Sequence, residues 1–451
     1  MKWHDRDKIA GQSIGRSLIL LAVPAVTSTL FTVVFEIIDM FWIGKLGPDS
    51  IAALSGASFF IWMVRGLGLT VATGTIALVA RRTGEKDETG LLITISNATA
   101  STFLFSILIM GVFFPLALYA FKWIRLDPTV AALAEDYTIV FLSGLIFVYL
   151  MMTVEFIIRG IGDTRTPMKL VGISLLLNAI LDPLFIFQFG MGLKGAAYAT
   201  ILSQSIGAIL MSAVLLKKIP RLRKRQSWAA AGSIRNFMQQ FFTIVKIGGP
   251  VGLSDAGFSF IYLVLSGIIS IFGKEPLAAI GISHRLEALP FFICLGFSMA
   301  VEPMVGQFLG AKDSDKARES VYLSLKVTSG IIFIISILYF LLAPSLYRIF
   351  TDNPVIIAHG VNYLRINAVL EVFLAFEVVL TGAFSGAGDT KPPFFIIFPI
   401  TFSRIPLAYL FAVTFNCGVT IIWVIIALTT FFKAMLLFYQ FQKGRWARKK
   451  I

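Results

Sequence analysis

The chain has 451 residues, of which 57% are hydrophobic and only 14% are charged, with a net charge of +14. A water-soluble protein of this composition would not stay dissolved, so the sequence predicts a polytopic membrane protein. The positive charge is therefore expected in basic loops on the cytoplasmic side, and no nucleic acid is expected as a partner. The two cysteines, Cys294 and Cys417, predict no disulfide framework.

Twelve apolar segments are long enough to cross a hydrocarbon core of ~30 Å. The first six lie at residues 16–43, 51–80, 91–121, 131–158, 168–189 and 193–216. The second six lie at residues 237–272, 277–309, 321–346, 356–384, 394–415 and 419–441. Residues 1–15 are polar and charged, so no cleavable signal peptide is expected. The sequence predicts an all-α protein with an N-terminal six-helix bundle at 1–216, a basic cytoplasmic linker at 217–236 and a C-terminal six-helix bundle at 237–451.

Loop charges predict the orientation in the membrane. With both termini in the cytoplasm, the linker and both basic tails lie inside, together with Arg81, Arg82, Lys86, Arg159, Arg165, Lys169, Lys312, Lys316, Arg318 and Lys391. The outer loops then hold only Lys45, Lys122, Arg125, Lys194, Lys274 and Arg348. Because positive residues favour the cytoplasmic side, we expect a multi-pass protein of a cytoplasmic membrane with both ends inside.

An internal repeat determines the predicted architecture. A shift of 226 residues superposes Pro24 on Pro250, and the loop GIGDTRTP (160–167) on GAGDTKPP (386–393). The offset holds over about 170 residues without a gap. Because each half has an even number of spans, both enter the membrane in the same direction. The sequence thus predicts a parallel repeat about an axis along the membrane normal, an arrangement that places a substrate path between the halves.

The fifth apolar segment carries Asn178 and Asp182, which are four residues apart and so share one face of a helix. A carboxylate at that depth is expected to face a cavity, an ion or a partner. Pro183 follows directly and removes one backbone donor. The two polar side chains could therefore serve an ion site, or could satisfy the backbone around a proline kink.

Three features together resemble the multidrug and toxic compound extrusion (MATE) transporters. They are the repeat of six spans with an early proline in each half, the stretch DMFWIGKLGP at 39–48, and the paired GDT loops. The resemblance extends from about Ser17 to Phe441 and is greatest with the prokaryotic DinF-like branch. It implies a secondary transporter that exports organic, cationic or amphipathic compounds by alternating access, in exchange for sodium or protons.

In that branch an acidic cluster of the N-terminal bundle binds the coupling cation. The resemblance implies that Asp39, Asn178, Asp182 and Thr200 form this site here, with Tyr137 close to it. Another branch relies on a glutamate in the seventh span. This chain has Asp255 there, at a different distance from Pro250, so a second coupling site is not expected.

The depths of these residues support the same cluster independently of the resemblance. Asp39, Asp182 and Thr200 each lie eight residues from an outer-loop glycine, which places all three ~12 Å inside the membrane edge. The marker glycines are Gly47, Gly190 and Gly192. The offset shows that the scaffold does not require these side chains, since the second half has Leu265, Arg404, Ala408 and Ile426 at the positions of Asp39, Asn178, Asp182 and Thr200.

The nature of the coupling ion stays open. Carboxylate, amide and hydroxyl oxygens suit sodium, whereas two carboxylates in a poorly hydrated pocket also favour binding of a proton. Glu36, three residues before Asp39, is expected near the same helix face as an auxiliary carboxylate. Beyond this ion, no cofactor is expected.

The second half holds several intramembrane charges, namely Asp255, Glu302, Glu371, Glu377 and Arg404. One interpretation is mutual pairing, with Arg404 bound to Glu371 or Glu377. The alternative is an acidic lining of a substrate cavity. In the first half, Glu155 and Arg159 are four residues apart, which predicts a plain ion pair.

Two other functions are less consistent with the sequence than export. A flippase for lipid-linked saccharides would be expected to line its cavity with many arginines, whereas the first half offers mainly Arg65. An intramembrane enzyme is not expected because no HExxH or GxSxG motif is present. An ATP-driven pump is not expected either, because the sequence has no ATP-binding GxxxxGK[ST] loop. The expected partners are small organic substrates and membrane lipid, for a chain that acts as a monomer.

Overall fold

The computed structural model describes residues 13–123, 127–223, 234–449 and 451, and within these ranges the regular secondary structure is entirely helical. Ten of the described helices are long and apolar enough to cross a membrane, and two bent helix pairs would each add one span. The predicted all-α fold of twelve spans in two bundles is thereby confirmed. Most of the predicted polar start at 1–15, the central part of the predicted linker, Arg125 and the side chain of Lys122 lie outside the described residues.

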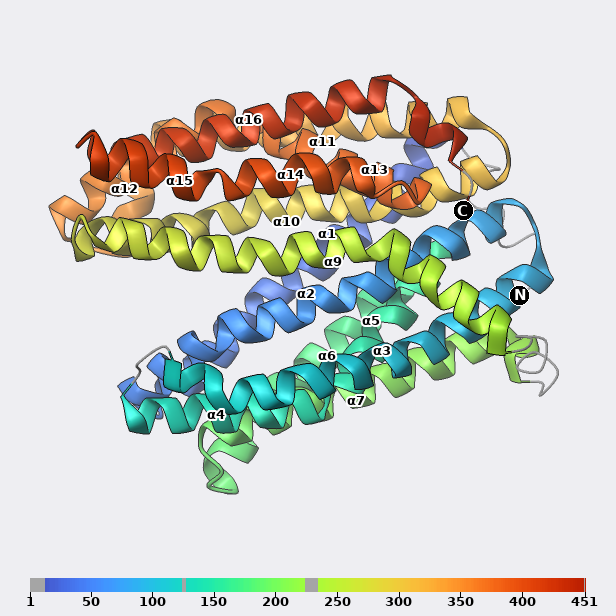
Figure 1. The fold of residues 1–451 in the computed structure, drawn as a ribbon, viewed down its shortest axis with the longest axis horizontal. Helices are drawn as coiled ribbons and strands as arrows, with labels where there is room; N and C mark the ends of the chain where they lie inside the picture. The colour runs from blue at the N-terminus through green and yellow to red at the C-terminus, as the bar shows by residue number, and fades with distance from the viewer. Residues whose placement is uncertain (1–12, 124–126, 224–233, 450) are drawn as a thin grey trace.

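The helices of the first half form one bundle, drawn from blue to green in Figure 1. They are α1 (Ile14–Gly44), α2 (Pro48–Gly84), α3 (Glu88–Trp123), α4 (Pro128–Ser143), α5 (Leu145–Gly160), α6 (Arg165–Pro183) and α7 (Leu193–Lys218). A π-helical turn, η2 (Leu184–Gln188), follows α6, and a 3-10 turn, η3 (Pro220–Arg223), follows α7. Lys217 and Lys218, predicted to begin the linker, are the last two residues of α7.

The second half repeats this order in yellow to red (Figure 1). Its helices are α9 (Ile234–Ser270), α10 (Lys274–Gly310), α11 (Ser314–Arg348), α12 (Pro354–Leu370), α13 (Val372–Ala387), α14 (Lys391–Phe402), α15 (Arg404–Ala408) and α16 (Thr420–Gln442). A π-helical turn, η4 (Tyr409–Thr414), precedes α16, and a 3-10 turn, η5 (Arg445–Arg448), follows it.

The fourth span of each half is bent, whereas the sequence predicted continuous helices at 131–158 and 356–384. The bend between α4 and α5 is 53° and that between α12 and α13 is 58°. The first bend falls at Gly144, where a Cβ atom would overlap the side chain of Ile201. The missing side chain therefore lets the bend lie close against α7. The second bend falls at Glu371, a buried carboxyl residue.

The paired GDT loops are stabilised by their aspartates. Asp163 accepts hydrogen bonds from the backbone N–H and the hydroxyl of Thr166, and its Oδ2 lies 2.7 Å from Nζ of Lys218. Burial acts to raise the pKa of Asp163, but the hydrogen bonds from Lys218 and Thr166 outweigh it and hold the pKa below its ordinary value. This stabilisation is present above the pKa of the unfolded carboxyl and is lost as the pH falls through the folded-state pKa. Asp389, at the matching position, pairs with Lys449 at 3.0 Å.

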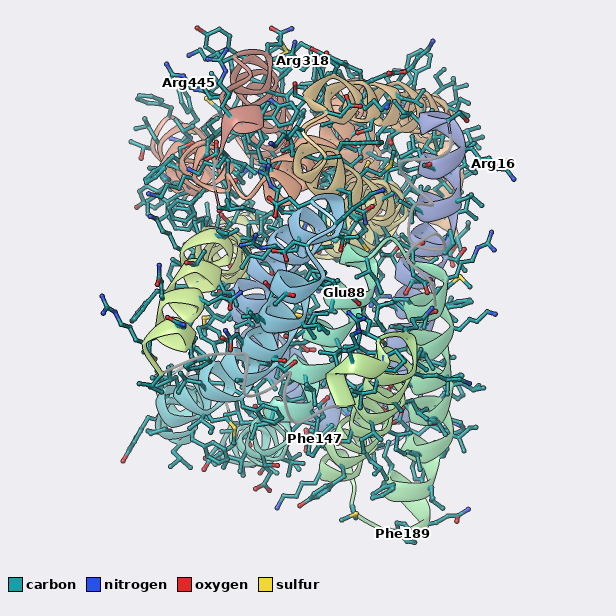
Figure 2. All side chains as sticks on the ribbon, turned by 90° about the vertical axis from the view of Figure 1, so that its right-hand side faces the viewer. Arg16, Glu88, Phe147, Phe189, Arg318 and Arg445 are labelled. Atoms are coloured by element: carbon teal, nitrogen blue, oxygen red, sulfur yellow. The ribbon has the colours of Figure 1, made fainter. Side chains whose placement is uncertain are left out.

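The described basic residues gather at one end of the molecule, which we call the basic end. There α2, α5 and α10 finish and α6, α11 and α14 begin, and both termini of the described chain lie at this end (Figure 1). Figure 2 looks onto the basic end, with Arg16, Arg318 and Arg445 labelled around it. The predicted charge asymmetry is therefore present in the fold, while the side of the membrane that the basic end faces stays a prediction.

The two bundles meet along a line of close backbone contacts that we call the seam. It joins residues 66–84 of α2 to residues 244–255 of α9 and 302–310 of α10, all in the half of the molecule nearer the basic end. The bundles also meet where α1 packs on α10, and there the Thr29 hydroxyl donates to the carbonyl of Phe292 at 3.0 Å. Cβ atoms at Gly74, Gly84, Gly248 and Gly310 would overlap backbone atoms of the opposite bundle. The helices α2 and α9 cross here, and their other ends lie apart (Figure 1).

Adding a methyl group at the seam is expected to destabilise this arrangement. In Gly248→Ala the new Cβ would overlap the backbone of Thr70 on α2, so the two bundles must separate locally. We expect a lower thermal unfolding midpoint. Gly267→Ala on the same helix is the matched control, because nothing lies within 4 Å of its Cβ position. Alanine is the better helix former, so that midpoint should stay equal or rise. Equal midpoints for the two variants would show that the seam tolerates the extra volume.

Candidate functional site

A pair of carboxyl groups lies between α1 and α6. Asp39 on α1 and Asp182 on α6 are close enough for their side chains to interact directly, as predicted from their matching depths. Asp182 is 1% exposed, and the Asp39 Oδ1 and Asp182 Oδ2 atoms are buried without a hydrogen-bond donor among the described residues. Two adjacent carboxylates without donors repel each other, so a cation between them would be stabilised.

Asn178 completes the turn of α6 on which Asp182 lies. Its amide Nδ2 donates to Asp182 Oδ1 at 2.9 Å, so the predicted side-by-side placement of these residues is confirmed. The π-helical turn η2 begins directly after Pro183. Asn178 thus satisfies one oxygen of Asp182 and leaves the other free for a ligand. The Asn178 amide donates to the Asp182 carboxyl and not to a backbone carbonyl next to Pro183. This hydrogen bond therefore does not serve to satisfy the backbone around the proline kink.

The other residues predicted for this cluster surround the pair at greater distance. Tyr137 on α4 is buried and lies within electrostatic range of both carboxyl groups. Glu36, one turn before Asp39, also lies within electrostatic range of it but is exposed. Thr200 on α7 is half-buried, and no contact places its hydroxyl on the carboxyl pair. The structure therefore brings together Asp39, Asp182 and Asn178 most closely.

Arg65 on α2 is a member of this region that the sequence reasoning did not assign to the site. Its guanidinium lies within electrostatic range of Glu36 and Tyr137 on the first bundle, and of Asp255 on α9 of the second. Asp255 is exposed and packs beside Gly66. The signal available in the sequence was a single arginine inside an apolar span, which is rare without a functional or structural partner.

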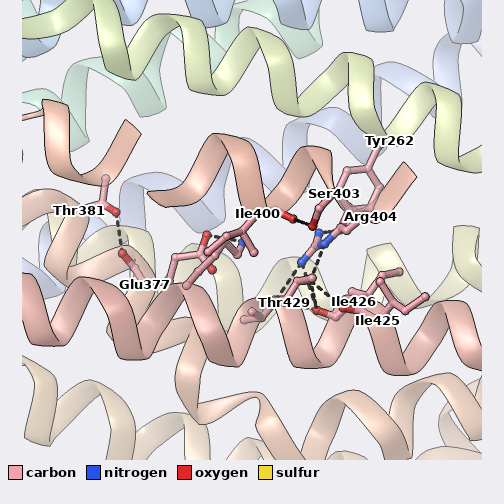
Figure 3. Close-up of polar contacts among 11 residues, drawn as sticks. Tyr262, Glu377, Thr381, Ile400, Ser403, Arg404, Ile425, Ile426 and Thr429 are labelled. Carbon is pink, nitrogen blue, oxygen red and sulfur yellow. Dashed lines mark hydrogen bonds and ion pairs between the residues drawn. The ribbon is translucent and has the colours of Figure 1, made fainter. Parts of the chain in front are cut away.

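Arg404, the second-half counterpart of Asn178, lies in a hydrogen-bond network inside the second bundle (Figure 3). Its guanidinium donates to the hydroxyls of Tyr262, Thr429 and Thr430 at 2.8–3.0 Å, and to the carbonyl of Ile426 at 3.2 Å. The predicted pairing of Arg404 with Glu371 or Glu377 is wrong for the described structure. Neutral oxygens from neighbouring turns of α16, together with the Tyr262 hydroxyl of α9, accept from the guanidinium instead.

Glu377 is paired with Lys433, a residue that the sequence reasoning passed over. The Lys433 Nζ lies 2.7 Å from Glu377 Oε1, and the lysine side chain is 3% exposed. A lone lysine inside the apolar run of α16 was the available signal. Glu371 is buried and lies within electrostatic range of Glu287, which accepts a hydrogen bond from Tyr363. Whether these acids border a substrate cavity stays a prediction.

Arg159 at the end of α5 joins the two bundles. Its Nη2 lies 2.9 Å from Glu302 Oε2 on α10, and its Nη1 lies 3.8 Å from Glu155 Oε1 one turn earlier. The predicted Glu155–Arg159 pair is thus confirmed, but the shorter contact crosses the seam. The Arg159 side chain is 2% exposed and its guanidinium also lies 4.4 Å from the ring of Phe156. Glu302, which the sequence predicted to line a substrate cavity, therefore forms an ion pair with Arg159.

The carboxyl pair is the group best suited to hold a cation. Asp39 and Asp182 supply up to four oxygens, of which two are buried without a donor among the described residues, and a single positive charge between them would relieve their repulsion. These oxygens fit either a proton shared between the carboxyls or a sodium ion with further neutral ligands. Within the described ranges, no group of three or more His, Cys, Asp or Glu side chains forms a metal site.

A membrane protein of twelve spans, with two repeated bundles and buried acidic side chains inside the spans, has the architecture of a secondary transporter. The sequence profile of the MatE family matches residues 24–184 and again residues 250–410. The second match begins and ends 226 residues after the first, which is the offset of the internal repeat. The chain therefore belongs to the MatE family, the multidrug and toxic compound extrusion transporters. Proteins of this family are multi-pass membrane transporters and not enzymes.

Individual relatives agree with this assignment. The chain is 29% identical to a probable multidrug resistance protein NorM of Thermotoga maritima, over 97% of this chain and 94% of the relative. It is 25% identical to a probable multidrug resistance protein YpnP of Bacillus subtilis, over 97% and 96% of the two chains. A solved MATE transporter described as outward-facing superposes with a TM-score of 0.88 at 23% identity, covering 98% of each chain.

Proposed function

We propose that the protein exports organic compounds, cationic or amphipathic in character, in exchange for an inward-moving cation held by Asp39 and Asp182. The observation that carries this proposal is the contact between two carboxyl groups whose Asp39 Oδ1 and Asp182 Oδ2 atoms are buried without donors. Such a pair binds one cation strongly and releases it when its surroundings change. The names of the multidrug relatives support export of such compounds, and they do not favour a lipid-linked saccharide as the substrate.

In this proposal the basic end faces the cytoplasm of a prokaryotic cell, as the excess of lysine and arginine there favours. The seam then closes the path on the cytoplasmic side, and export requires that it open. Loading of substrate from inside would break the contacts of α2 with α9 and α10 and the Arg159–Glu302 pair. In the arrangement described above the substrate leaves and the cation binds on the outside, and the cation-loaded protein then opens the seam and releases the cation inside.

The test is transport by the purified protein in sealed lipid vesicles that hold a fluorescent organic cation. A sodium gradient and a proton gradient are imposed separately, each with the other ion equal on both sides. Faster movement of the dye under one gradient than without it supports the proposal and identifies the coupling ion. Dye movement that is the same with and without either gradient would contradict coupled export.

The neutral neighbours of the pair are expected to matter less than its charges. Asn178→Ala removes the donor to Asp182 Oδ1, a hydrogen bond to a charged group whose loss costs about 1.5–3 kcal/mol. We therefore expect gradient-driven transport to persist with a changed apparent affinity for the coupling ion. The affinity should be weaker if the ion is sodium, because the amide orients Asp182. It should be stronger if the ion is a proton, because the amide donor favours the ionised form of Asp182. Thr200→Ala should have a smaller effect, because Asp39 Oδ1 and Asp182 Oδ2 accept no hydrogen bond from any described residue, the Thr200 hydroxyl included. The apparent ion affinity of each variant is measured from the dependence of the dye export rate on ion concentration. An affinity of Asn178→Ala equal to that of wild type would exclude the amide from the site.

A further inference from the structure

The basic end holds a cavity of about 480 Å³ between α6 and α7, which neither the coupling site nor the seam uses. Three lysines and two apolar side chains line it together with one hydroxyl, namely Lys169, Lys217, Lys218, Leu170, Val214 and Thr166. We call it the lysine pocket. It lies on the outside of the first bundle, away from the contacts with the second.

The lysine pocket has an excess of positive charge. Lys218 is neutralised by Asp163, whose Oδ2 lies 2.7 Å away. Lys169 and Lys217 are exposed, and the described part of the chain offers neither of them an ion pair. Two uncompensated ammonium groups at the rim of one cavity attract an anion, and a phosphate group fits that chemistry.

The surface next to the lysine pocket is apolar. Leu170 and Val214 line the cavity itself, and the next turns deeper into the membrane expose Ile173 on α6 and Leu210 on α7. The exposed fractions of Ile173 and Leu210 are 45% and 38%. A ligand that matches a positively charged pocket followed by an apolar helix surface has an anionic head and apolar chains.

We propose that the lysine pocket binds an anionic phospholipid, with its phosphate between Lys169 and Lys217 and its acyl chains along α6 and α7. The lipid belongs to the leaflet at the basic end, which is the cytoplasmic leaflet in the orientation proposed above. A bound lipid there would contact only the bundle that carries Asp39 and Asp182, so it does not join the moving halves.

The repeat supplies an internal comparison for this proposal. At the matching corner of the second bundle, the 226-residue offset puts Phe395 in the place of Lys169 and Gly444 in the place of Lys218. Only Lys217 keeps its charge, as Lys443. The helical scaffold therefore does not require the set of three lysines at this corner, and the second bundle keeps only one of these three positions as lysine.

The test measures lipid retention by native mass spectrometry of the purified full chain. The protein is mixed with equal amounts of phosphatidylglycerol and phosphatidylcholine that carry the same acyl chains. Wild type is expected to retain phosphatidylglycerol in preference. In Lys169→Gln/Lys217→Gln we expect roughly thirtyfold weaker retention, from the summed contributions of two lysines near an anionic headgroup. Lys169→Arg/Lys217→Arg keeps both charges and should retain the lipid.

The control variant is Lys391→Gln/Lys443→Gln, which removes two exposed lysines from the corresponding corner of the second bundle. It should retain phosphatidylglycerol as wild type does. Equal retention by wild type and Lys169→Gln/Lys217→Gln, or an equal loss in the control, would overturn the proposal. A loss in the arginine variant would overturn it too, as would displacement of the lipid by excess inorganic phosphate, which would identify a free-phosphate site. Thermal midpoints verify that each variant is folded.

Discussion

Gradient-driven export is expected to fall to the background rate in Asp39→Asn and in Asp182→Asn. Each substitution keeps the shape of the side chain and removes one of the two charges that would hold the cation. The remaining carboxylate can still interact with the new amide, as Asp182 does with Asn178, so folding should be preserved. The loss is therefore expected in coupling and not in the amount of folded protein.

The matched control for these variants is Asp136→Asn. Asp136 lies on α4, one residue before Tyr137, and forms a half-exposed ion pair with Lys194 at 2.9 Å. Exposed pairs of this kind contribute at most about 1 kcal/mol. Its export rate should remain close to wild type. The measurement is dye export from vesicles under a sodium or proton gradient, together with dye binding without a gradient, which should survive in all three variants. Wild-type export by folded Asp39→Asn or Asp182→Asn would end the hypothesis.

Glu302→Gln is expected to shift the protein away from the arrangement in which the seam is closed. Arg159 would keep its position in the interface with a neutral amide in place of the carboxylate at 2.9 Å, so that Glu155 at 3.8 Å would be its only remaining ion-pair partner among the described residues. Removing one partner of a buried ion pair costs about 3–5 kcal/mol. Because this pair joins two bundles, separation of the bundles is one way to hydrate the arginine and recover part of that cost.

Glu377→Gln is the control, since Glu377 pairs with Lys433 inside one bundle. Both variants should lower the thermal midpoint. Only Glu302→Gln should change the distance between spin labels placed on the two bundles at the basic end, and only it should slow export through this shift. The double variant Arg159→Met/Glu302→Gln removes both charges and should recover much of the stability. An unchanged distance distribution in Glu302→Gln would mean that the pair does not hold the seam.

The buried charges show where sequence reasoning succeeds and where it fails. Asn178 and Asp182 were placed together because residues four apart share a helix face, and the structure has their side chains hydrogen-bonded. Arg404 was assigned to an acidic partner because charges inside a membrane are usually paired. The fold instead surrounds it with hydroxyl groups, and Lys433 takes Glu377. Which buried charges pair within a bundle depends on how each helix is rotated about its own axis. The spacing of residues in the sequence does not specify that rotation.

The amino-acid sequence alone predicts the twelve spans, the parallel repeat and the presence of the Asp39–Asp182 pair in the first half only. Each of these depends on local properties: the length of an apolar run, a constant offset of 226 residues, and the distance of a residue from a loop. Only the tertiary structure decided that Arg159 reaches Glu302, that α2 and α9 meet through glycines, and that the fourth spans bend at Gly144 and Glu371. Those features arise between residues far apart in the chain, whose approach depends on how closely the helix backbones pack.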